Sequence, residues 1–501
     1  MAHQSRTRRP SPRRQRQRKG TASCSGVESL RSCFDWFLGD LDIFAKVRLH
    51  GNISWTASSL VILALCWSWS EARFVTDAFA DAATWSRTLL GHSVLTTYQG
   101  FMGALATWTP SLMPLLIGLL QKRMAQVGGK FYCVDGYVPI AFDGSRSTAP
   151  RTRSNEAAFC AKHYGQGTTA KYRKKKSKGM RRKQNQRHPA QAQEPQVWIT
   201  MLWHMGLRLP WDWELGPTSA SERDHVETML ERGSFPASTL LCGDAGFVGY
   251  PFWSRMDNAG LKFLVRVGGN VRLLSEHANF TLEKKAHQEH RVLCWSKAAQ
   301  TKDQRPLRLR LAYVCVGKTW MWLLTNELDR HKLTRKMMVR FYQRRWGVEV
   351  EFRGLKQTLD RAKLRCRNSQ RLRAELTWSI LAMAVAELLA VKEQVARRAK
   401  HPKRKADPKS KPYDPGQRSL ASTMRAIRGC LKHLTSLPEP GEDLASLLGQ
   451  AVADSYQRTQ SKKARYRPPN PDKKPLGDPK IRSLDQEEKR KLMQHEQQKA
   501  T

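Results

Sequence analysis

Four polar residues constrain this chain more than any other feature, because their spacing brings them together on one face of an α-helix. The segment YQRRWGVEVEFRGLK carries the spacing Y-x2-R-x3-E-x6-K, formed by Tyr342, Arg345, Glu349 and Lys356. At about 100° per residue, the four side chains fall within a stripe roughly 60° wide. Glu351 points about 160° away from Glu349 on the same helical wheel. The stripe therefore predicts a helix and selects Glu349 from two neighbouring acids.

The side chains of this stripe suit the chemistry of metal ions and phosphates. A carboxylate can hold a divalent cation, and a phenol, a guanidinium and an ammonium can hold phosphate oxygens. The alternative is a surface helix with ordinary charge pairs at i,i+3 and i,i+4. The acids elsewhere in the chain therefore decide between a binding site and an ordinary surface helix.

Two earlier aspartates stand where short apolar runs stop. The segment GYVPIAFDGSRS carries one run that ends at Asp143, and STLLCGDAGF carries another that ends at Gly243-Asp244. Each predicts a buried strand that meets a loop, so that its acid faces a cleft. Asp135, in CVDGYV, competes with Asp143 for the first position. We favour Asp143 because the apolar run leads directly into it.

These segments resemble the insertion-sequence-four family of bacterial cut-and-paste transposases. The resemblance rests on the Y-x2-R-x3-E-x6-K spacing, on WLLTN (Trp322–Asn326) before it, and on LKQTLDRAKLR after it. The DGSR context also resembles the family's first acidic motif. The resemblance implies that Asp143, Asp244 and Glu349 form the catalytic, metal-binding triad.

The resemblance also implies an activity and its partners. The expected activity is cleavage of double-stranded DNA at transposon ends, followed by joining of the 3′-hydroxyls to target DNA. The expected cofactor is a pair of Mg²⁺ ions, with Mn²⁺ as a substitute, since hard oxygen ligands suit both ions. Tyr342, Arg345 and Lys356 are expected to grip DNA phosphates. A homodimer in the DNA complex and a bacterial cytoplasmic location are implied as well.

The charge of the chain agrees with a nucleic-acid partner. The 87 Lys and Arg residues exceed the 43 Asp and Glu residues, which gives a net charge of +44. So large an excess points to a polyanion. No stretch of about 20 uninterrupted apolar residues suggests a membrane span. The apolar run Leu376–Val391 contains Glu387 and is expected to be a buried helix packed on the catalytic one.

A basic block interrupts the predicted catalytic region. Lys171–Arg187 contains ten basic residues and no acid, so it predicts an exposed loop that contacts the DNA backbone. A localisation signal or a solubility feature is the alternative. The residues expected to contact DNA are Lys174, Lys175, Lys176, Arg181 and Arg182.

The fold class expected is α/β, with a ribonuclease-H-like catalytic core. From residue 130, the apolar runs and cap signals predict the order β-β-β-α-β-α-β, which is typical of that fold. Two strands are expected at Gln196–Met205 and Leu207–Glu214, and Ser219–Glu222 predicts a capping box that opens the next helix. Strands in a β-rich insertion are expected at Val271–Leu274, Arg291–Trp295 and Leu307–Leu324.

Composition divides the chain into six regions. The two ends are rich in basic and polar residues and are expected to be disordered, apart from a possible helix near Leu484–Gln498. The expected regions are a basic tail (1–26), a helical N-terminal domain with a DNA-end-binding role (27–128), the catalytic domain (130–400, with the insertion at about 268–326), a basic linker (401–418), a small helical segment (419–457) and a basic tail (458–501).

Several alternatives stay open at this point. Cys160 with His163, and His287 with His290 and Cys294, are half-sites for zinc without a second matching pair, so free thiols are expected. The resemblance implies that an aromatic residue of the β-rich insertion holds a flipped DNA base. Trp295, Trp320 and Trp322 are the candidates, and core packing also explains each of them.

Other functions compete with transposition. A catalytically inactive, transposase-derived DNA-binding protein is the main alternative. A basic architectural protein would leave the one-face stripe unexplained. A tyrosine recombinase would use Tyr342 as a nucleophile without a metal ion.

Overall fold

The structure is a computed structural model of the chain. It describes residues 26–39, 41–45, 47, 51, 53–160, 194–233, 235–284, 288–400, 414–434, 443–453 and 476–500. The basic block Lys171–Arg187 and the first basic tail lie outside the described residues, as does residue range 401–413 of the linker.

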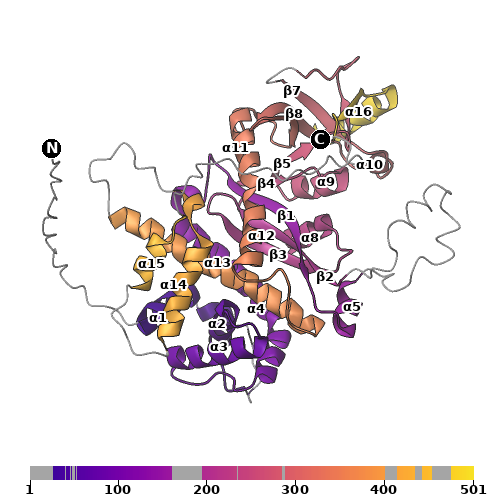
Figure 1. Cartoon of the computed structure of the whole chain (residues 1–501). Helices are drawn as coiled ribbons and strands as arrows, with labels where there is room; N and C mark the ends of the chain where they lie inside the picture. The colour runs from indigo at the N-terminus through magenta and orange to yellow at the C-terminus, as the bar shows by residue number, and fades with distance from the viewer. Residues whose placement is uncertain are drawn as a thin grey trace, which may run out of the picture.

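One large mixed sheet organises the fold (Figure 1). Its strands follow the spatial order β10-β6-β7-β8-β9-β5-β4-β1-β2-β3. The strands are β1 Val138–Thr148, β2 Gln196–His204, β3 Leu209–Gly216, β4 Thr239–Gly243, β5 Lys262–Val267, β6 Arg272–Ser275, β7 Glu289–Cys294, β8 Leu307–Val316, β9 Thr319–Thr325 and β10 Lys480–Ser483.

The predicted element order is confirmed in the catalytic region. After β1, β2 and β3 come helix α8 (Glu222–Arg232), β4, helix α9 (Tyr250–Asn258) and β5. A short helix, α5 (Arg153–Phe159), lies between β1 and β2. Strands β1, β2 and β3 pair antiparallel, whereas β1, β4 and β5 pair parallel. The chain is therefore a mixed α/β protein.

Helices cover both faces of the central strands. Helices α11 (Arg335–Arg345) and α12 (Gly347–Gln357) lie across β1, β4 and β5 on one face (Figure 1). Helix α8 lies against β1, β2 and β3 on the other face. Because side chains alternate along a strand, neighbouring residues of β1 point to different helices.

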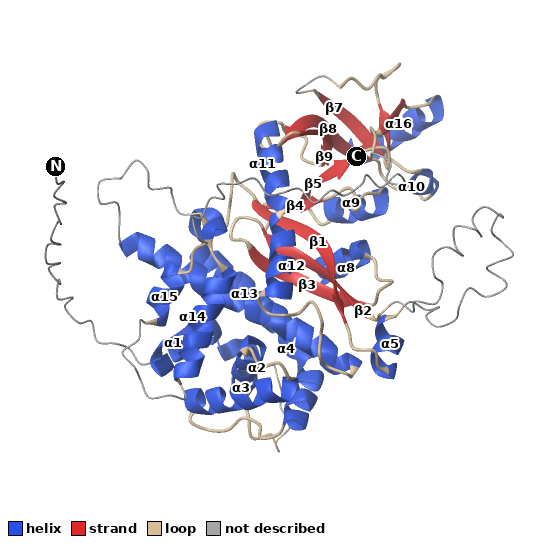
Figure 2. Ribbon diagram, in the orientation of Figure 1, coloured by secondary structure: helices blue, strands red, loops and turns tan. Residues whose placement is uncertain are grey.

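A helical layer packs beside the sheet (Figure 2). It is built around α13, which contacts α2, α4, α12, α14 and α15. The indole N–H groups of Trp69 and Trp378 tie the N-terminal helices to α13, through Ala382 O (2.9 Å) and Thr109 Oγ1 (2.8 Å). The helices of this layer are α1 Gly26–Leu38, α2 Ala57–Trp69, α3 Val75–Leu90, α4 Tyr98–Gly128, α13 Ser369–Lys400, α14 Leu420–His433 and α15 Leu444–Gln450. The N-terminal region is thus helical, and it packs directly on the catalytic region; its role in binding DNA ends stays a prediction.

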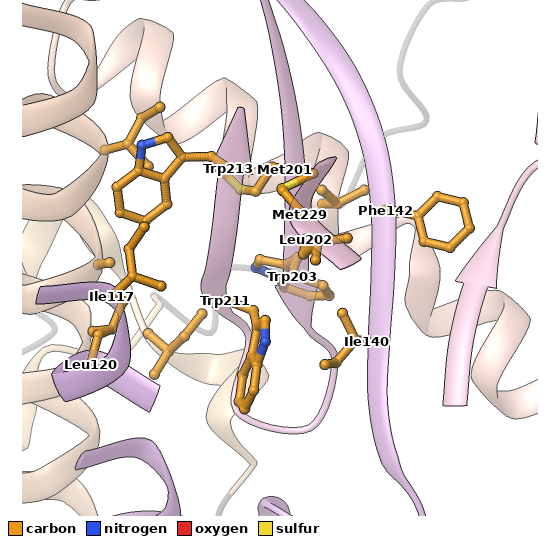
Figure 3. Close-up of a cluster of buried hydrophobic side chains, with 14 of the residues drawn as sticks. Ile117, Leu120, Ile140, Phe142, Met201, Leu202, Trp203, Trp211, Trp213 and Met229 are labelled. Carbon is orange, nitrogen blue, oxygen red and sulfur yellow. The ribbon is translucent and has the colours of Figure 1, made fainter. Parts of the chain in front are cut away.

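Aromatic side chains fill the space between the sheet and this layer. Figure 3 shows Trp211 and Trp213 of β3 beside Ile117 and Leu120 of α4, all buried. A buried aromatic side chain removes a large apolar area from water. The β3 side of the sheet is therefore anchored to the helices, whereas the edge between β1 and β4 carries polar residues.

Within the described residues, two helices are long and apolar enough to cross a membrane by length and composition. The most apolar window of Ser369–Arg397 is 94% buried inside the protein, as expected for a core helix. The corresponding window of Tyr98–Phe131 is 39% buried. The predicted burial of Leu376–Val391 is confirmed.

The β-rich insertion and the C-terminus differ from expectation in two ways. Leu307–Leu324 is not one strand but the hairpin β8–β9, which turns at Gly317 with φ of 66°. Disorder is expected for the C-terminal tail apart from a helix near Leu484–Gln498, yet strand β10 pairs parallel with β6. The expected helix is confirmed as α16 (Gln486–Ala500). The Lys-rich composition of this tail does not predict β10, which is stabilised by its pairing with β6. Helix α10 (Lys297–Thr301) completes this part.

Candidate active site

Asp143 lies where the parallel pairing of β1 ends. Strand β1 pairs parallel with β4 from Val138 to Ala141 and stays paired with β2 through Thr148. The expectation that the strand stops at Asp143 is therefore wrong, because the antiparallel ladder to β2 continues past it. Asp244 follows the last residue of β4, Gly243. Both acids thus lie at the same edge, beyond the parallel strands.

The predicted helix is interrupted inside its polar stripe. Helix α11 ends at Arg345, Trp346 has φ −57° and ψ −16°, and α12 begins at Gly347. A Cβ on Gly347 would lie 2.0 Å from the indole ring of Trp203, so the glycine allows α12 to approach β2 closely. A single helical wheel therefore does not describe the whole stripe, although its residues still gather at one place.

Arg345 joins two of the predicted acids. Its Nη1 lies 3.4 Å from Oδ2 of Asp143, and its Nη2 lies 4.0 Å from Oε1 of Glu349. The Arg345 side chain is 7% exposed, compared with 36% for Glu349. Asp244 lies close enough for its charge to act on both of the other acids. Arg345 therefore links Asp143 with Glu349, and Asp244 lies near these two acids.

The pKa values of Asp143 and Glu349 are both raised. Burial is the main cause that raises the pKa of Asp143, and the charge of Asp244 adds to it, whereas the Gly144 N–H and Arg345 oppose the rise. Burial also raises the pKa of Glu349, and the charges of Asp143 and Asp244 add to it. Like charges held close together favour protonation or a counter-cation.

The donor set suits a hard divalent cation. Among the described residues, no three His, Cys, Asp or Glu side chains are already close enough to enclose a metal ion. The cationic group between Asp143 and Glu349 is Arg345, whose buried Nε has no hydrogen-bond partner within the described chain. The oxygen atoms of carboxylates are hard ligands, which Mg²⁺ and Mn²⁺ prefer, and a bound cation would offset the repulsion between the acids. We conclude that Asp143, Asp244 and Glu349 could hold such an ion.

Tyr342 and Lys356, the other two residues of the stripe, lie beside Arg345 and β1 respectively. The Arg345 guanidinium lies 5.4 Å from the ring centroid of Tyr342. Lys356 donates a hydrogen bond to Ser145 Oγ at 2.7 Å, on the same face of β1 as Asp143, and burial lowers the pKa of its ammonium. Tyr342 is 8% exposed, and burial raises the pKa of its phenol.

Several candidates lie elsewhere. Asp135 is exposed in the turn between Val134 and Tyr137, and it pairs with Arg340. Every cysteine in the described part of the chain is a free thiol. The zinc half-site partners His163 and His287 lie outside the described residues, as do the predicted DNA contacts Lys174, Lys175, Lys176, Arg181 and Arg182.

Glu351 points away from the acids, as the helical wheel predicts, but it is not a surface residue. It is 7% exposed and accepts a hydrogen bond from Trp203 Nε1 at 3.1 Å. Burial, together with the charge and hydrogen bond of Glu387, raises its pKa well above the usual range. Glu387 in turn pairs with Arg418 at 3.1 Å. Glu351 is therefore a buried carboxyl that links α12 to Trp203 of β2.

We expect Glu351→Ala to destabilise the protein by about 1–3 kcal/mol, because it leaves the buried Trp203 Nε1 without its acceptor. Glu351→Gln preserves the shape and the donor of the protonated acid. The folded state binds more protons than the unfolded state once the pH exceeds the unfolded pKa, so wild-type stability falls as the pH rises. Glu351→Gln should therefore gain stability relative to the wild type between pH 5 and 8. Urea melts across that range measure both effects; a Glu351→Gln that loses stability as pH rises would contradict a neutral Glu351.

Sequence reasoning missed one acid, Glu222. The expected capping box began at Ser219, whereas the N-cap is Ser221, whose hydroxyl accepts from Asp224 N. Glu222 is therefore the first residue of α8 and is free to face β1. Burial, then the charges of Asp143 and Asp244, raise its pKa to about 7. The adjacent Ser221 and Glu222 were the available signal in the sequence. The expected cap lay two residues too early, so Glu222 was assigned to the capping box.

The three tryptophans have different environments. Trp295 and Trp322 are 4% and 2% exposed, and their indole N–H groups bind Gln304 O and Asp478 Oδ1. Trp320 is 42% exposed and stacks on Tyr313 with ring centroids 5.1 Å apart. Core packing thus explains the first two.

Comparisons with known proteins place these features in a family. The family model described as "Transposase DDE domain" matches residues 135–385, just over half of the chain. A comparison with curated proteins finds no match. Among solved structures, a cryo-EM structure of a piggyBac transposase synaptic complex with hairpin DNA matches with 12% identity and a TM-score of 0.38, over 86% of this chain and 87% of that chain. We draw nothing from a likeness at that TM-score.

Proposed function

The chain belongs to the transposase DDE domain family, and from this premise we propose that it cleaves DNA at transposon ends and transfers the strands into target DNA, with a divalent metal. The observation that carries the proposal is that Arg345 joins Asp143 to Glu349, with Asp244 close enough for its charge to act on both acids. These acids come from β1, from the end of β4 and from α12, so only the folded chain assembles them.

We assign the chain, within that family, to the insertion-sequence-four group with a ribonuclease-H-like core. The group assignment rests on the Y-x2-R-x3-E-x6-K spacing. The core assignment is supported by the spatial order β3-β2-β1-β4-β5, with three antiparallel strands followed by two parallel ones. The first two acids of this core lie at the end of its parallel strands.

Asp143, Asp244 and Glu349 would hold Mg²⁺ or Mn²⁺. When bound, such an ion polarises a phosphate oxygen and lowers the pKa of a coordinated water. The chain's own residues supply the rest. Arg345 and Lys356 are placed to bind the phosphates that flank the scissile bond, and the buried Tyr342 supports the Arg345 guanidinium.

Basic residues extend this surface beyond the acids. Arg353, Lys363 and Arg367 are exposed on α12 and on the loop that follows it. Such residues contribute sequence-independent contacts to the DNA backbone. Among the tryptophans considered, Trp320 is the one whose exposure suits stacking on a DNA base. We further propose a homodimer in the DNA complex and a bacterial cytoplasmic location.

The direct test uses the purified chain and duplexes that carry the element's flanking genomic ends. We expect strand nicking at the ends with Mg²⁺ or Mn²⁺, and none with EDTA. End binding without metal-dependent nicking would support the alternative, a catalytically inactive DNA-binding derivative. A covalent protein–DNA adduct formed in EDTA would indicate the recombinase mechanism.

We expect replacement of Lys171–Arg187 by a neutral Gly/Ser segment of equal length to weaken binding to any DNA sequence. Each lost phosphate contact should lower the slope of log affinity against log salt by about 0.9. Filter binding at several salt concentrations measures that slope. An unchanged slope would show that the block contacts no DNA backbone and would favour localisation or solubility as its role.

A further inference from the structure

One peptide unit beside Asp244 is held from both sides. Oδ1 of Asp244 accepts a hydrogen bond from the Gly246 N–H at 2.7 Å, and Nδ2 of Asn270 donates one to the Ala245 carbonyl at 2.8 Å. This carbonyl and this N–H belong to the same planar peptide, in which they point in opposite directions. The Asn270 amide and the Asp244 carboxylate are therefore joined through a single rigid unit.

The Asn270 side chain is itself fixed by the turn that carries it. Its Oδ1 accepts a hydrogen bond from the Gly268 N–H at 3.1 Å, and the Gly268 carbonyl accepts one from the Val271 N–H at 3.0 Å, between β5 and β6. One partner of the amide is an N–H group and the other is a carbonyl, so the oxygen must face Gly268 and the nitrogen must face Ala245. Both ends of the amide are thus used.

The C-terminal segment holds this turn from outside. The Leu476 carbonyl accepts a hydrogen bond from the Gly269 N–H at 2.8 Å. A Cβ on Gly268 would lie 2.5 Å from Cγ of Leu476, so the segment lies directly against the turn. Strand β10 continues this contact along β6. The turn that carries Asn270 is therefore clamped between the sheet and the C-terminal segment.

The backbone of Asp244 has less support from the sheet than the backbone of Asp143. Asp143 lies inside a strand and is paired with Met201 of β2. Asp244 follows the end of β4, and helix α9 begins only at Tyr250, so the acid lies in a loop. A contact from outside that loop is therefore needed to fix the direction of the Asp244 carboxylate.

We propose that Asn270 is a positioning residue of the site, which orients the peptide between Ala245 and Gly246 and so sets the direction of the Asp244 carboxylate. This inference rests on the proposed function, because it assigns Asp244 to the reaction. Asn270 is exposed, so loss of its donor leaves the core of the fold unchanged. The same loss frees the Asp244 carboxylate to move, and a misplacement of about 1 Å can cost about a hundredfold in rate.

The first test is hydrogen–deuterium exchange of the full chain in EDTA, with Asn270→Ser as the variant. A serine hydroxyl can still accept from the Gly268 N–H, but it is too short to reach the Ala245 carbonyl. We expect the amides of Gly246 and Phe247 to exchange at least about threefold faster than in the wild type, because one hydrogen bond of the loop is lost. Unchanged exchange of these amides would overturn the inference.

Asn258→Ser is the matched control. Asn258 is also exposed and accepts a hydrogen bond of 2.8 Å from Arg305, but it lies at the C-terminal end of α9. Exchange in the loop 244–249 should match the wild type in this variant. Exchange in the segment 476–484 should stay unchanged in Asn270→Ser. Faster exchange there would show that Asn270 only supports docking of the C-terminal segment, and it would overturn the inference.

Single-turnover nicking of transposon ends gives the second readout. We expect Asn270→Ser to lower the rate at saturating DNA at least tenfold, with affinity for the ends in EDTA within twofold of the wild type, and Asn258→Ser to change neither. A wild type that nicks while Asn270→Ser nicks equally well overturns only this inference. If the wild type does not nick, the proposed function fails and the inference fails with it.

Discussion

Asp143→Asn and Asp244→Asn should each reduce DNA nicking at least about a thousandfold, or by about 4 kcal/mol of transition-state stabilisation. The reason is that an amide cannot replace an anionic oxygen ligand of a divalent cation. Binding to the element's ends should stay near the wild-type level, because both acids repel phosphates and contribute nothing to holding DNA. Single-turnover nicking and gel-shift assays on the same preparations measure the two quantities.

Asp135→Asn is the control for the first acid. Asp135 lies in an exposed turn and pairs with Arg340, away from the other acids. Nicking by this variant should stay within about threefold of the wild type, which is about 0.7 kcal/mol. Loss of nicking in Asp135→Asn, together with retained nicking in Asp143→Asn, would show that the wrong acid has been assigned.

Glu349→Gln should abolish nicking to a similar extent, whereas Glu351→Gln should keep it within about tenfold, or about 1.4 kcal/mol. The two residues are two positions apart and have the same chemistry. Glu349 is 36% exposed beside Arg345, whereas Glu351 is 7% exposed beneath Trp203. Single-turnover nicking by the two folded variants measures the difference.

The alanine variant of Glu351 is the wrong control, although the sequence alone favours it as a tolerated change. The helical wheel places Glu351 on the far side correctly but gives no sign that it is buried there. Because Glu351→Ala is expected to destabilise the fold, its loss of activity would be ambiguous. Loss of nicking in a folded Glu351→Gln, with retained activity in Glu349→Gln, would contradict the assignment.

Local patterns in the sequence predicted much of the site. Apolar runs located β1 and β4, and the spacing of polar residues located the helix that carries Glu349. These predictions succeeded because they depend on residues close together in the chain. The preference for Asp143 over Asp135 stays a prediction; it rests on the strand that leads directly into Asp143.

The features that escaped prediction depend on contacts between distant residues. The helix is interrupted at Trp346, and the next residue, Gly347, lies against Trp203 of β2. Glu351 is buried through partners on β2 and α13. Glu222 of α8 lies beside Gly144 of β1. Strand β10 joins a strand about two hundred residues earlier in the chain. Composition does not report such contacts.

The most direct measurement for the central claim is an anomalous difference map from crystals of the chain grown with Mn²⁺. The account predicts a strong peak within coordination distance of Asp143, Asp244 and Glu349, with the Arg345 guanidinium moved away from the position between Asp143 and Glu349. Mn²⁺ bound elsewhere, with Arg345 still joining those two acids, would contradict the claim that they form a metal-dependent active site.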